Sequence, residues 1–153
     1  DLVAANPRVR SVECPYTGER LATVPAINPD VTILHAQRAD RQGNVGLHGI
    51  LGAQREAALA ARELVVTVEE IVEEIPPAMN GIVLPHWVVS AVAHCPGGAY
   101  PAYAQGCYAR DNAFYQRWDA IARERDGFRA WMDTHVLGSR DHAGFLASLR
   151  EAA

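Results

Sequence analysis

An apolar run, a helix-favouring segment and a second apolar run place the strongest constraint on how this chain folds. Residues 31–36 form the first run and have the character of a strand buried on both faces. Residues 53–64 favour a helix, and residues 64–68 are apolar and β-branched. This order of strand, loop, helix and strand is a βαβ unit, which predicts a right-handed crossover between parallel strands.

We expect a single α/β unit across residues 1–153, in a three-layer α/β/α arrangement around a mostly parallel sheet. Residues 1–30 are a connector rich in Pro, Gly and turn formers, residues 31–110 form the strand and helix core, and residues 111–153 form a helical tail packed on the sheet. The further elements expected are an edge strand at 21–25, a loop at 40–52, an acidic turn or short helix after 68, a strand at 81–85, a helix or a strand at 87–94, and helices at 112–125, 127–136 and 141–151 with Asp126 and Asp141 as N-caps.

The composition excludes several classes of protein. Only 14 of the 153 residues are Lys or Arg, they are scattered, and the net charge is -4, so we expect no nucleic-acid partner. The three cysteines make neither a disulfide framework nor a zinc motif, which indicates reduced thiols in a cytoplasmic protein. The six histidines form neither HxH nor HExxH, so no metal site is expected. No apolar run has the length of a membrane span, so we expect no membrane partner.

Polar side chains follow the two apolar runs of the βαβ unit. Gln37 comes directly after the first strand, at the carboxyl edge of a parallel sheet, where α/β proteins place their ligands. Glu69 follows the second run and could reach the same crevice, either as a nucleophile or base or as a structural cap. His35 is a candidate for the pocket, or alternatively a buried structural residue bonded to backbone.

The segment "PGGAYPAYAQGCY", residues 96–108, is a glycine- and aromatic-rich loop. Its adjacent glycines allow the backbone to approach a ligand closely, and Tyr100, Tyr103 and Tyr108 offer flat surfaces with polar ends. An ordered loop of this length costs entropy to hold, which favours a functional role over a packed connection that caps the sheet.

Several motifs in order resemble the family I coenzyme A transferases, most closely the A subunit of glutaconate CoA-transferase. They are "VPAINPDVTILHAQRADRQGNV", "AARELVVTVEEIV" and "VLPHWVVSAVAHCPGGAYPAYAQGCYARDNAFYQRWD". The resemblance covers residues 6–151 and corresponds to the C-terminal half of a polypeptide about twice as long. Because the chain begins at Asp1 within a connector-like stretch, we expect it to be a fragment.

The resemblance implies one component of a two-subunit enzyme that moves CoA between an acyl-CoA and a carboxylic acid. The nucleophilic glutamate of this ping-pong reaction lies in an E-x-G motif of the B subunit, so no catalytic residue is expected in this chain and the chain alone is expected to be inactive. The CoA thioester is a substrate, and no permanently bound cofactor is expected. The substrate-binding residues implied are Gln37, Gly97, Gly98, Ala99 and Tyr100, and the candidates for pocket or structural roles are His35, Asn44, Glu69, Tyr103 and Gln105.

The chain departs from the family pattern in one loop. The family's G-A-H-P-S segment reads Gly98-Ala99-Tyr100-Pro101-Ala102 here, which leaves the acyl preference open. One alternative keeps the fold and replaces acyl exchange by ring-opening hydrolysis of a CoA-linked substrate. A second alternative is a non-catalytic interaction domain, since half of such a sheet has edges that need a partner.

Overall fold

The structure is a computed structural model that describes residues 2–151. Its strands are β1 (Arg10–Glu13), β2 (Arg20–Thr23), β3 (Val31–Asp40), β4 (Val45–His48), β5 (Glu63–Val72), β6 (Gly81–Leu84) and β7 (Ala91–His94). Its helices are α1 (Leu2–Ala5), α2 (Gln54–Ala60), the 3-10 turn η1 (His86–Val88), α3 (Asn112–Arg123), α4 (Arg125–Trp131), the π-helical turn η2 (Met132–Leu137) and α5 (His142–Glu151).

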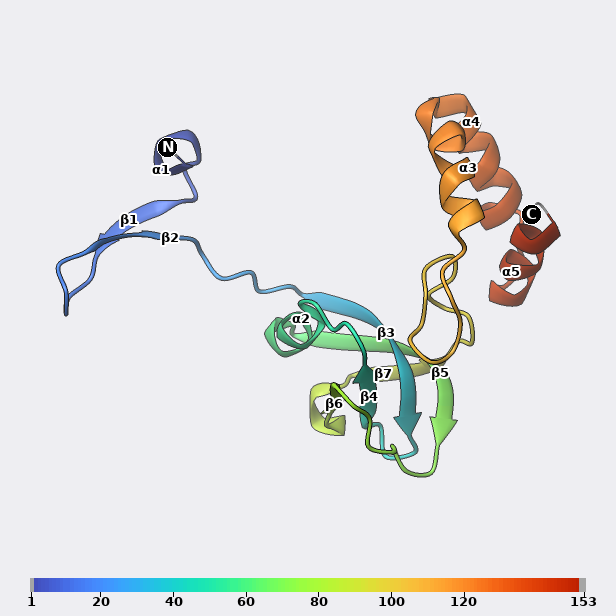
Figure 1. The fold of residues 1–153 in the computed structure, drawn as a ribbon, viewed down its shortest axis with the longest axis horizontal. Helices are drawn as coiled ribbons and strands as arrows, with labels where there is room; N and C mark the ends of the chain where they lie inside the picture. Colours follow the sequence, from blue (N-terminus) through green and yellow to red (C-terminus); the bar gives the residue numbers. More distant parts are fainter. Residues whose placement is uncertain (1, 152–153) are drawn as a thin grey trace.

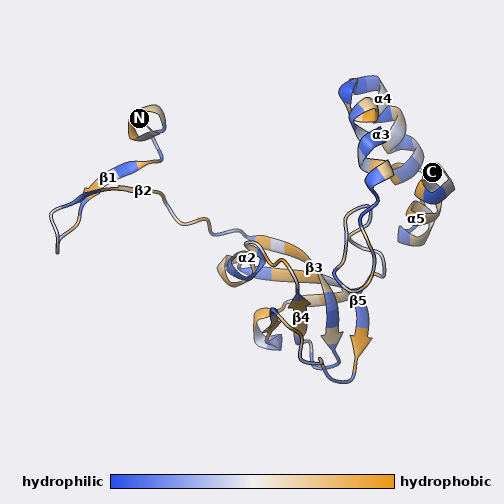
Figure 2. Ribbon diagram, in the orientation of Figure 1, coloured by the Kyte–Doolittle hydropathy of each residue, from blue (hydrophilic) through white to orange (hydrophobic). Residues whose placement is uncertain are grey.

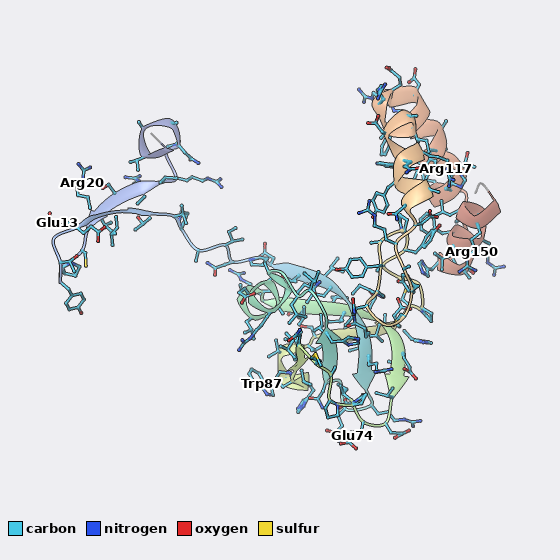
Figure 3. The ribbon with its side chains drawn as sticks, viewed as in Figure 1. Glu13, Arg20, Glu74, Trp87, Arg117 and Arg150 are labelled. Atoms are coloured by element: carbon cyan, nitrogen blue, oxygen red, sulfur yellow. The ribbon has the colours of Figure 1, made fainter. Side chains whose placement is uncertain are left out.

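Three parts follow one another along the molecule (Figure 1). An arm made of the antiparallel pair β1 and β2 extends from one side of a central sheet, and α3, α4 and α5 form a helical group on the other side. Glu13 and Arg20, which are paired in the arm, lie far from the sheet in Figure 3. In the part of the chain that the structure describes, no helix is both long and apolar enough to cross a membrane.

The central sheet has the strand order β6-β4-β3-β5-β7. Strands β3, β5 and β7 run parallel, whereas β4 is antiparallel to both β3 and β6. The crossover from β3 through α2 to parallel β5 confirms the βαβ unit. The α/β fold class is also confirmed, and in the central sheet β4 alone runs against the other strands. Strand β4 lies in the segment expected to be a loop, where a tight turn joins it to β3: Asp40 accepts hydrogen bonds from the backbone of Gln42 and Asn44 at 2.9 Å each.

The hydrophobic core lies on one face of the sheet, under α2. It contains Ala36, Ala58, Leu64, Val66 and Val68, all almost fully buried. The hydroxyl of Thr32 donates to the carbonyl of Ala57, 3.0 Å away, and so ties β3 to the helix. In Figure 2 the strands of the sheet carry much of the hydrophobic colour, whereas α3 and α4 carry a larger hydrophilic share.

The other face of β3 is open at its start, which corrects the expectation of a strand buried on both faces. Val31 is 52% exposed and Ile33 is 72% exposed. In the described part of the chain, α2 packs on the face that carries the core. The face that carries Ile33 and His35 meets the loop at 95–110 and no described helix. A continuous apolar run therefore did not mean burial on both sides.

The C-terminal helices pack chiefly on one another. The expectation that they pack on the sheet was wrong. Edge-to-face rings hold α3 to α4, with Trp118 and Trp131 centred 4.8 Å apart. Asp141 is an N-cap as expected and accepts from the N–H of Gly144 at 2.9 Å. Asp126 is not, because α4 begins at Arg125 and Asp126 falls inside its first turn. The helical group meets the loop at 95–110 through α5, where Leu146 lies against Gly97.

Candidate functional site

The site forms where β7 stops beside two longer strands. Strand β7 ends at His94, which pairs with Val68 in the middle of β5, while β3 and β5 continue for several residues. The polar residues expected at the end of a strand, His35 and Gln37, therefore lie within β3. After β7 the chain folds back over these residues as a loop at 95–110, which forms the missing wall above the exposed face of the sheet.

Glu69 is the centre of a hydrogen-bond network that joins β3, β5 and this loop. The Nε2–H of His35 donates to Oε1 of Glu69 at 2.6 Å, and the hydroxyl of Tyr108 donates to the same oxygen at 2.6 Å. The N–H of Gly97 donates to Oε2 at 2.7 Å. The Nδ1 atom of His35 is 2.8 Å from the hydroxyl oxygen of Thr67, so both ring nitrogens have partners. The side chain of Glu69 is only 10% exposed.

Hydrogen bonding opposes burial in its effect on the pKa of Glu69, whereas the bond to Glu69 and burial act together on the pKa of Tyr108. Burial acts to raise the pKa of Glu69, but the hydrogen bonds from Tyr108, Gly97 and His35 outweigh it and hold that pKa below its ordinary value. Burial and the bond to Glu69 raise the pKa of Tyr108 well above the ordinary value for a tyrosine. Glu69 is therefore held ionised and Tyr108 neutral around pH 7.

Beside this network lies a cavity of about 350 Å³, a volume in the usual range for small-molecule sites. Its lining residues come from β3, from β4 and the segment that follows it, and from the loop: Ile33, Leu34, His35, Gln37, His48, Ile50, Gln54, Ala99, Ala102, Tyr103, Ala104 and Gln105. None of these lining residues is an acid, a lysine or an arginine. The cavity therefore offers amides and imidazoles over an apolar floor.

Comparison with known proteins assigns the chain to a family. A family model described as Coenzyme A transferase matches residues 3–94, more than half of the chain. The chain belongs to the coenzyme A transferase family. The resemblance inferred from the motifs is thereby confirmed.

Two relatives and one solved structure extend the match of this coenzyme A transferase chain. The A subunit of the 3-oxoadipate CoA-transferase of Pseudomonas knackmussii is 56% identical over 99% of this chain and 54% of that protein. The A subunit of the glutaconate CoA-transferase of Acidaminococcus fermentans is 36% identical over 86% of this chain and 42% of that protein. The crystal structure of glutaconate coenzyme A-transferase from the same organism matches with a TM-score of 0.83 at 30% identity, over 93% of this chain and 46% of that one. The chain thus spans about half the length of these relatives.

The amide of Gln37 is less free than the sequence suggested. Its Oε1 accepts from the N–H of His48 at 3.2 Å, and its Nε2 donates to the carbonyl of the same residue at 3.3 Å. Since a primary amide carries two N–H groups, one remains without a partner in the part of the chain that the structure describes. Gln37 therefore keeps one N–H donor beside the cavity.

The four expected loop residues separate into two groups. Ala99 lines the cavity and gives its N–H to the hydroxyl of Tyr108 at 3.0 Å. Gly98 packs on His35, with no room for a side chain between them. Gly97 and Tyr100 face a separate hollow toward α5, and the hydroxyl of Tyr100 donates to Asp111.

Of the five further candidates, Tyr103 and Gln105 line the cavity together with His35. His35 is mostly buried, as one alternative held, but its partners are side chains and not backbone. Asn44 lies in the turn between β3 and β4, where its amide donates to Asp40 at 2.7 Å and accepts from the N–H of His86 at 2.8 Å. That geometry gives Asn44 a structural role. Across the described residues, no group of three or more His, Cys, Asp or Glu side chains is arranged to hold a metal ion.

Sequence reasoning missed two residues that build the site, Thr67 and His48, and named Tyr108 only as one of three aromatic residues of the loop. Thr67 and Tyr108 belong to the Glu69 network, and His48 fixes the amide of Gln37. The alternation of Thr67 with Glu69 along β5 was a usable signal, because it places both on the face that carries His35. Nothing local distinguishes Tyr108 from the other tyrosines of the loop.

Proposed function

We propose that this chain is part of the A subunit of a two-subunit CoA-transferase and supplies one wall of its acyl pocket. The lining of the cavity carries the proposal: it contains no carboxylate that could attack a thioester. The adjacent Glu69 has hydrogen bonds on both of its oxygens and is nearly buried. The nucleophile is therefore expected to lie outside these residues, and the family resemblance implies that it belongs to the B subunit.

The proposed reaction has two half-reactions. A glutamate that belongs to the B subunit first attacks the carbonyl of the acyl-CoA, and CoA leaves as the thiolate while an acyl–glutamyl anhydride forms. The thiolate then attacks the glutamyl carbonyl of the anhydride, which releases the acyl group as a carboxylate and leaves a glutamyl–CoA thioester. The incoming carboxylate takes the CoA by the reverse sequence.

Within this scheme the chain binds and orients the acyl group. The unpaired N–H of Gln37 and the amide of Gln105 can donate to a carboxylate or a thioester oxygen, while Ile33 and Ile50 contact the carbon chain. A pocket with amide donors and no cation suits a short acyl chain that ends in a polar group. Following the relative that is 56% identical, we propose 3-oxoadipate as the carboxylic acid that accepts CoA.

The test uses the complete A subunit that contains these residues, co-expressed with its B subunit. Succinyl-CoA and acetyl-CoA serve as CoA donors and 3-oxoadipate or glutaconate as acceptors, and products are separated by liquid chromatography and mass spectrometry. We expect acyl-CoA exchange that requires both polypeptides, with a borohydride-trapped label on a glutamate of the B subunit. Gln37→Ala in the same complex is expected to raise the KM of the acceptor about tenfold, the effect of one lost hydrogen bond to a charged group.

Three outcomes contradict the proposal. Label on Glu69 of this chain would move the nucleophile into the A subunit. Net hydrolysis of the thioester without transfer would favour the ring-opening hydrolase, and binding of the B subunit without any turnover would favour an interaction domain.

A further inference from the structure

We propose that Glu69 and Tyr108 are positioning residues that fasten the loop at 95–110 to the sheet. They clamp it at both ends of its segment 97–108, and they thereby set the width of the cavity. The role of the cavity as an acyl pocket rests on the proposed function. The clamp itself rests on the contacts of the loop, and the two can be tested separately.

Both ends of the loop meet at one carboxylate. The N–H of Gly97, at the start of the loop, donates to Oε2 of Glu69, and the hydroxyl of Tyr108, at its end, donates to Oε1. Glu69 belongs to β5, and the bond from His35 ties the same carboxylate to β3. The loop is therefore fastened to the two longest strands of the sheet at a single point.

Tyr108 transmits this anchor to the wall of the cavity. Its hydroxyl oxygen accepts from the N–H of Ala99 at 3.0 Å, and its backbone exchanges hydrogen bonds with Ala104 at 3.0 and 3.2 Å. Ala99 and Ala104 both line the cavity. A shift of Tyr108 as a whole consequently moves two parts of the wall together, Ala99 through the hydroxyl and Ala104 through the backbone.

The loop also has little freedom above the site. A Cβ atom built on Gly98 would lie 2.7 Å from two ring atoms of His35, so the backbone of the loop rests directly on that ring. Since the Nε2 of His35 is bonded to Glu69, the carboxylate determines where the ring lies as well as where the loop is attached. The wall and the floor of the cavity thus depend on the same side chain.

Neither residue is placed to react. Glu69 and Tyr108 are absent from the described lining of the cavity, and both oxygens of Glu69 are occupied. Their influence on a ligand passes through Ala99, Ala104 and His35. Loss of the clamp should therefore weaken substrate binding more than it slows the chemical step.

The experiment compares Tyr108→Phe, Glu69→Gln and the double variant with Tyr115→Phe in the complete A subunit. Tyr115 lies on α3, where its ring contacts Phe114 and Arg110, and it makes no contact with the Glu69 network among the bonds of the described residues. Hydrogen–deuterium exchange of the isolated polypeptide reports on the loop, and steady-state kinetics of the complex with the B subunit report on the pocket. Far-UV circular dichroism confirms that each variant is folded.

We expect amide exchange in peptides from 97–108 to rise about tenfold in Tyr108→Phe and in Glu69→Gln, the loss expected for one or two hydrogen bonds. Exchange in β3 and in 112–131 should not change, and Tyr115→Phe should match the wild type everywhere. In the complex, the KM for the acceptor should rise about tenfold while kcat stays within about threefold. The double variant should be no worse than the stronger single variant, because both act on one clamp.

Unchanged exchange across 97–108 in a folded Tyr108→Phe variant would overturn the clamp, whatever the enzyme activity. A fall in kcat with KM unchanged would overturn the positioning role and make one of the two residues part of the chemistry. If the wild-type complex transfers no CoA, the proposed function fails, but the exchange data still decide the clamp. If Glu69→Gln does not fold, Tyr108→Phe alone decides it.

Discussion

The Nε2 atom of His35 lies 2.6 Å from Oε1 of Glu69, and this bond joins neighbouring parallel strands through their side chains. Parallel strands pair through evenly spaced backbone hydrogen bonds. The bond between His35 and Glu69 adds a side-chain link to that pairing. Here it occurs where the loop needs a fixed point. The same bond explains why a histidine is tolerated within a strand of the sheet.

Replacement of His35 by Ala is expected to destabilise the protein. The change leaves the nearly buried carboxylate of Glu69 without one of its three donors and leaves a cavity under Gly98. We expect the free energy of unfolding to fall by about 1–3 kcal/mol, measured by urea denaturation. His86→Ala is the control, because that side chain is exposed, and a loss of similar size there would contradict the prediction.

Gly98→Ala should distort the site. The added Cβ atom would lie 2.7 Å from ring atoms of His35 and 2.9 Å from the carbonyl oxygen of Cys95, so the ring or the loop has to move. We expect a loss of about 1–3 kcal/mol of stability, measured by thermal unfolding.

Gly144→Ala provides the matched control for Gly98→Ala. Gly144 lies in α5, and a Cβ atom there meets its nearest neighbour at an ordinary 3.5 Å. Because Ala favours a helix more than Gly does, this variant should gain about 0.5–1 kcal/mol. Equal effects of the two substitutions would argue against close packing of the loop on His35.

Asp111 should contribute to stability as a helix cap. It accepts from the N–H of Phe114 at 2.8 Å at the start of α3 and also from the hydroxyl of Tyr100. Asp111→Ala is expected to cost about 0.5–2 kcal/mol, while Asp111→Asn, which keeps an oxygen acceptor, should cost less. Denaturant midpoints of the two variants provide the comparison, and an equal loss in both would mean that charge, not capping, determines the effect.

The Glu69 network should weaken in acid. The pKa of Glu69 is lower in the folded protein than in the unfolded chain, so its stabilising effect is complete above the unfolded value of about 4.3 and is lost as the pH falls through the folded value. The difference in unfolding free energy between the wild type and Glu69→Gln should therefore be constant above about pH 5.5 and shrink below it.

Denaturation at a series of pH values measures this difference. Glu74→Gln is the control, since that side chain is exposed on the turn after β5 (Figure 3) and has no hydrogen-bonded partner among the described residues. A difference for Glu69→Gln that grows as the pH falls would have the wrong sign and would contradict the network.

The sequence predicted the fold well where periodicity and composition act locally. The apolar runs and the Ala-rich segment between them led to β3, α2 and β5, and the Pro–Gly boundaries led to β6. Strand β4 was missed because its four residues, with Gly46 among them, lie in a segment that has the composition of a loop. Its place is determined by pairing with β3 and β6, which no local pattern reveals.

The candidate site was predicted less completely, for a related reason. His35, Gln37, Tyr103 and Gln105 were all identified and lie around one cavity. Tyr108 was named only as an aromatic residue of the loop, because its role depends on a contact with Glu69, 39 positions away in the sequence. Asn44 was included because of the family resemblance, but its side chain closes a turn instead.

The attachment of the loop at its two ends has an evolutionary consequence. The residues between Gly97 and Tyr108 reach the cavity without taking part in the pairing of β3 with β5. Mutations in that short stretch can therefore change the shape of the cavity, while selection for a stable sheet acts on other residues. Within such a family, substrate range can drift quickly on a scaffold that itself changes slowly.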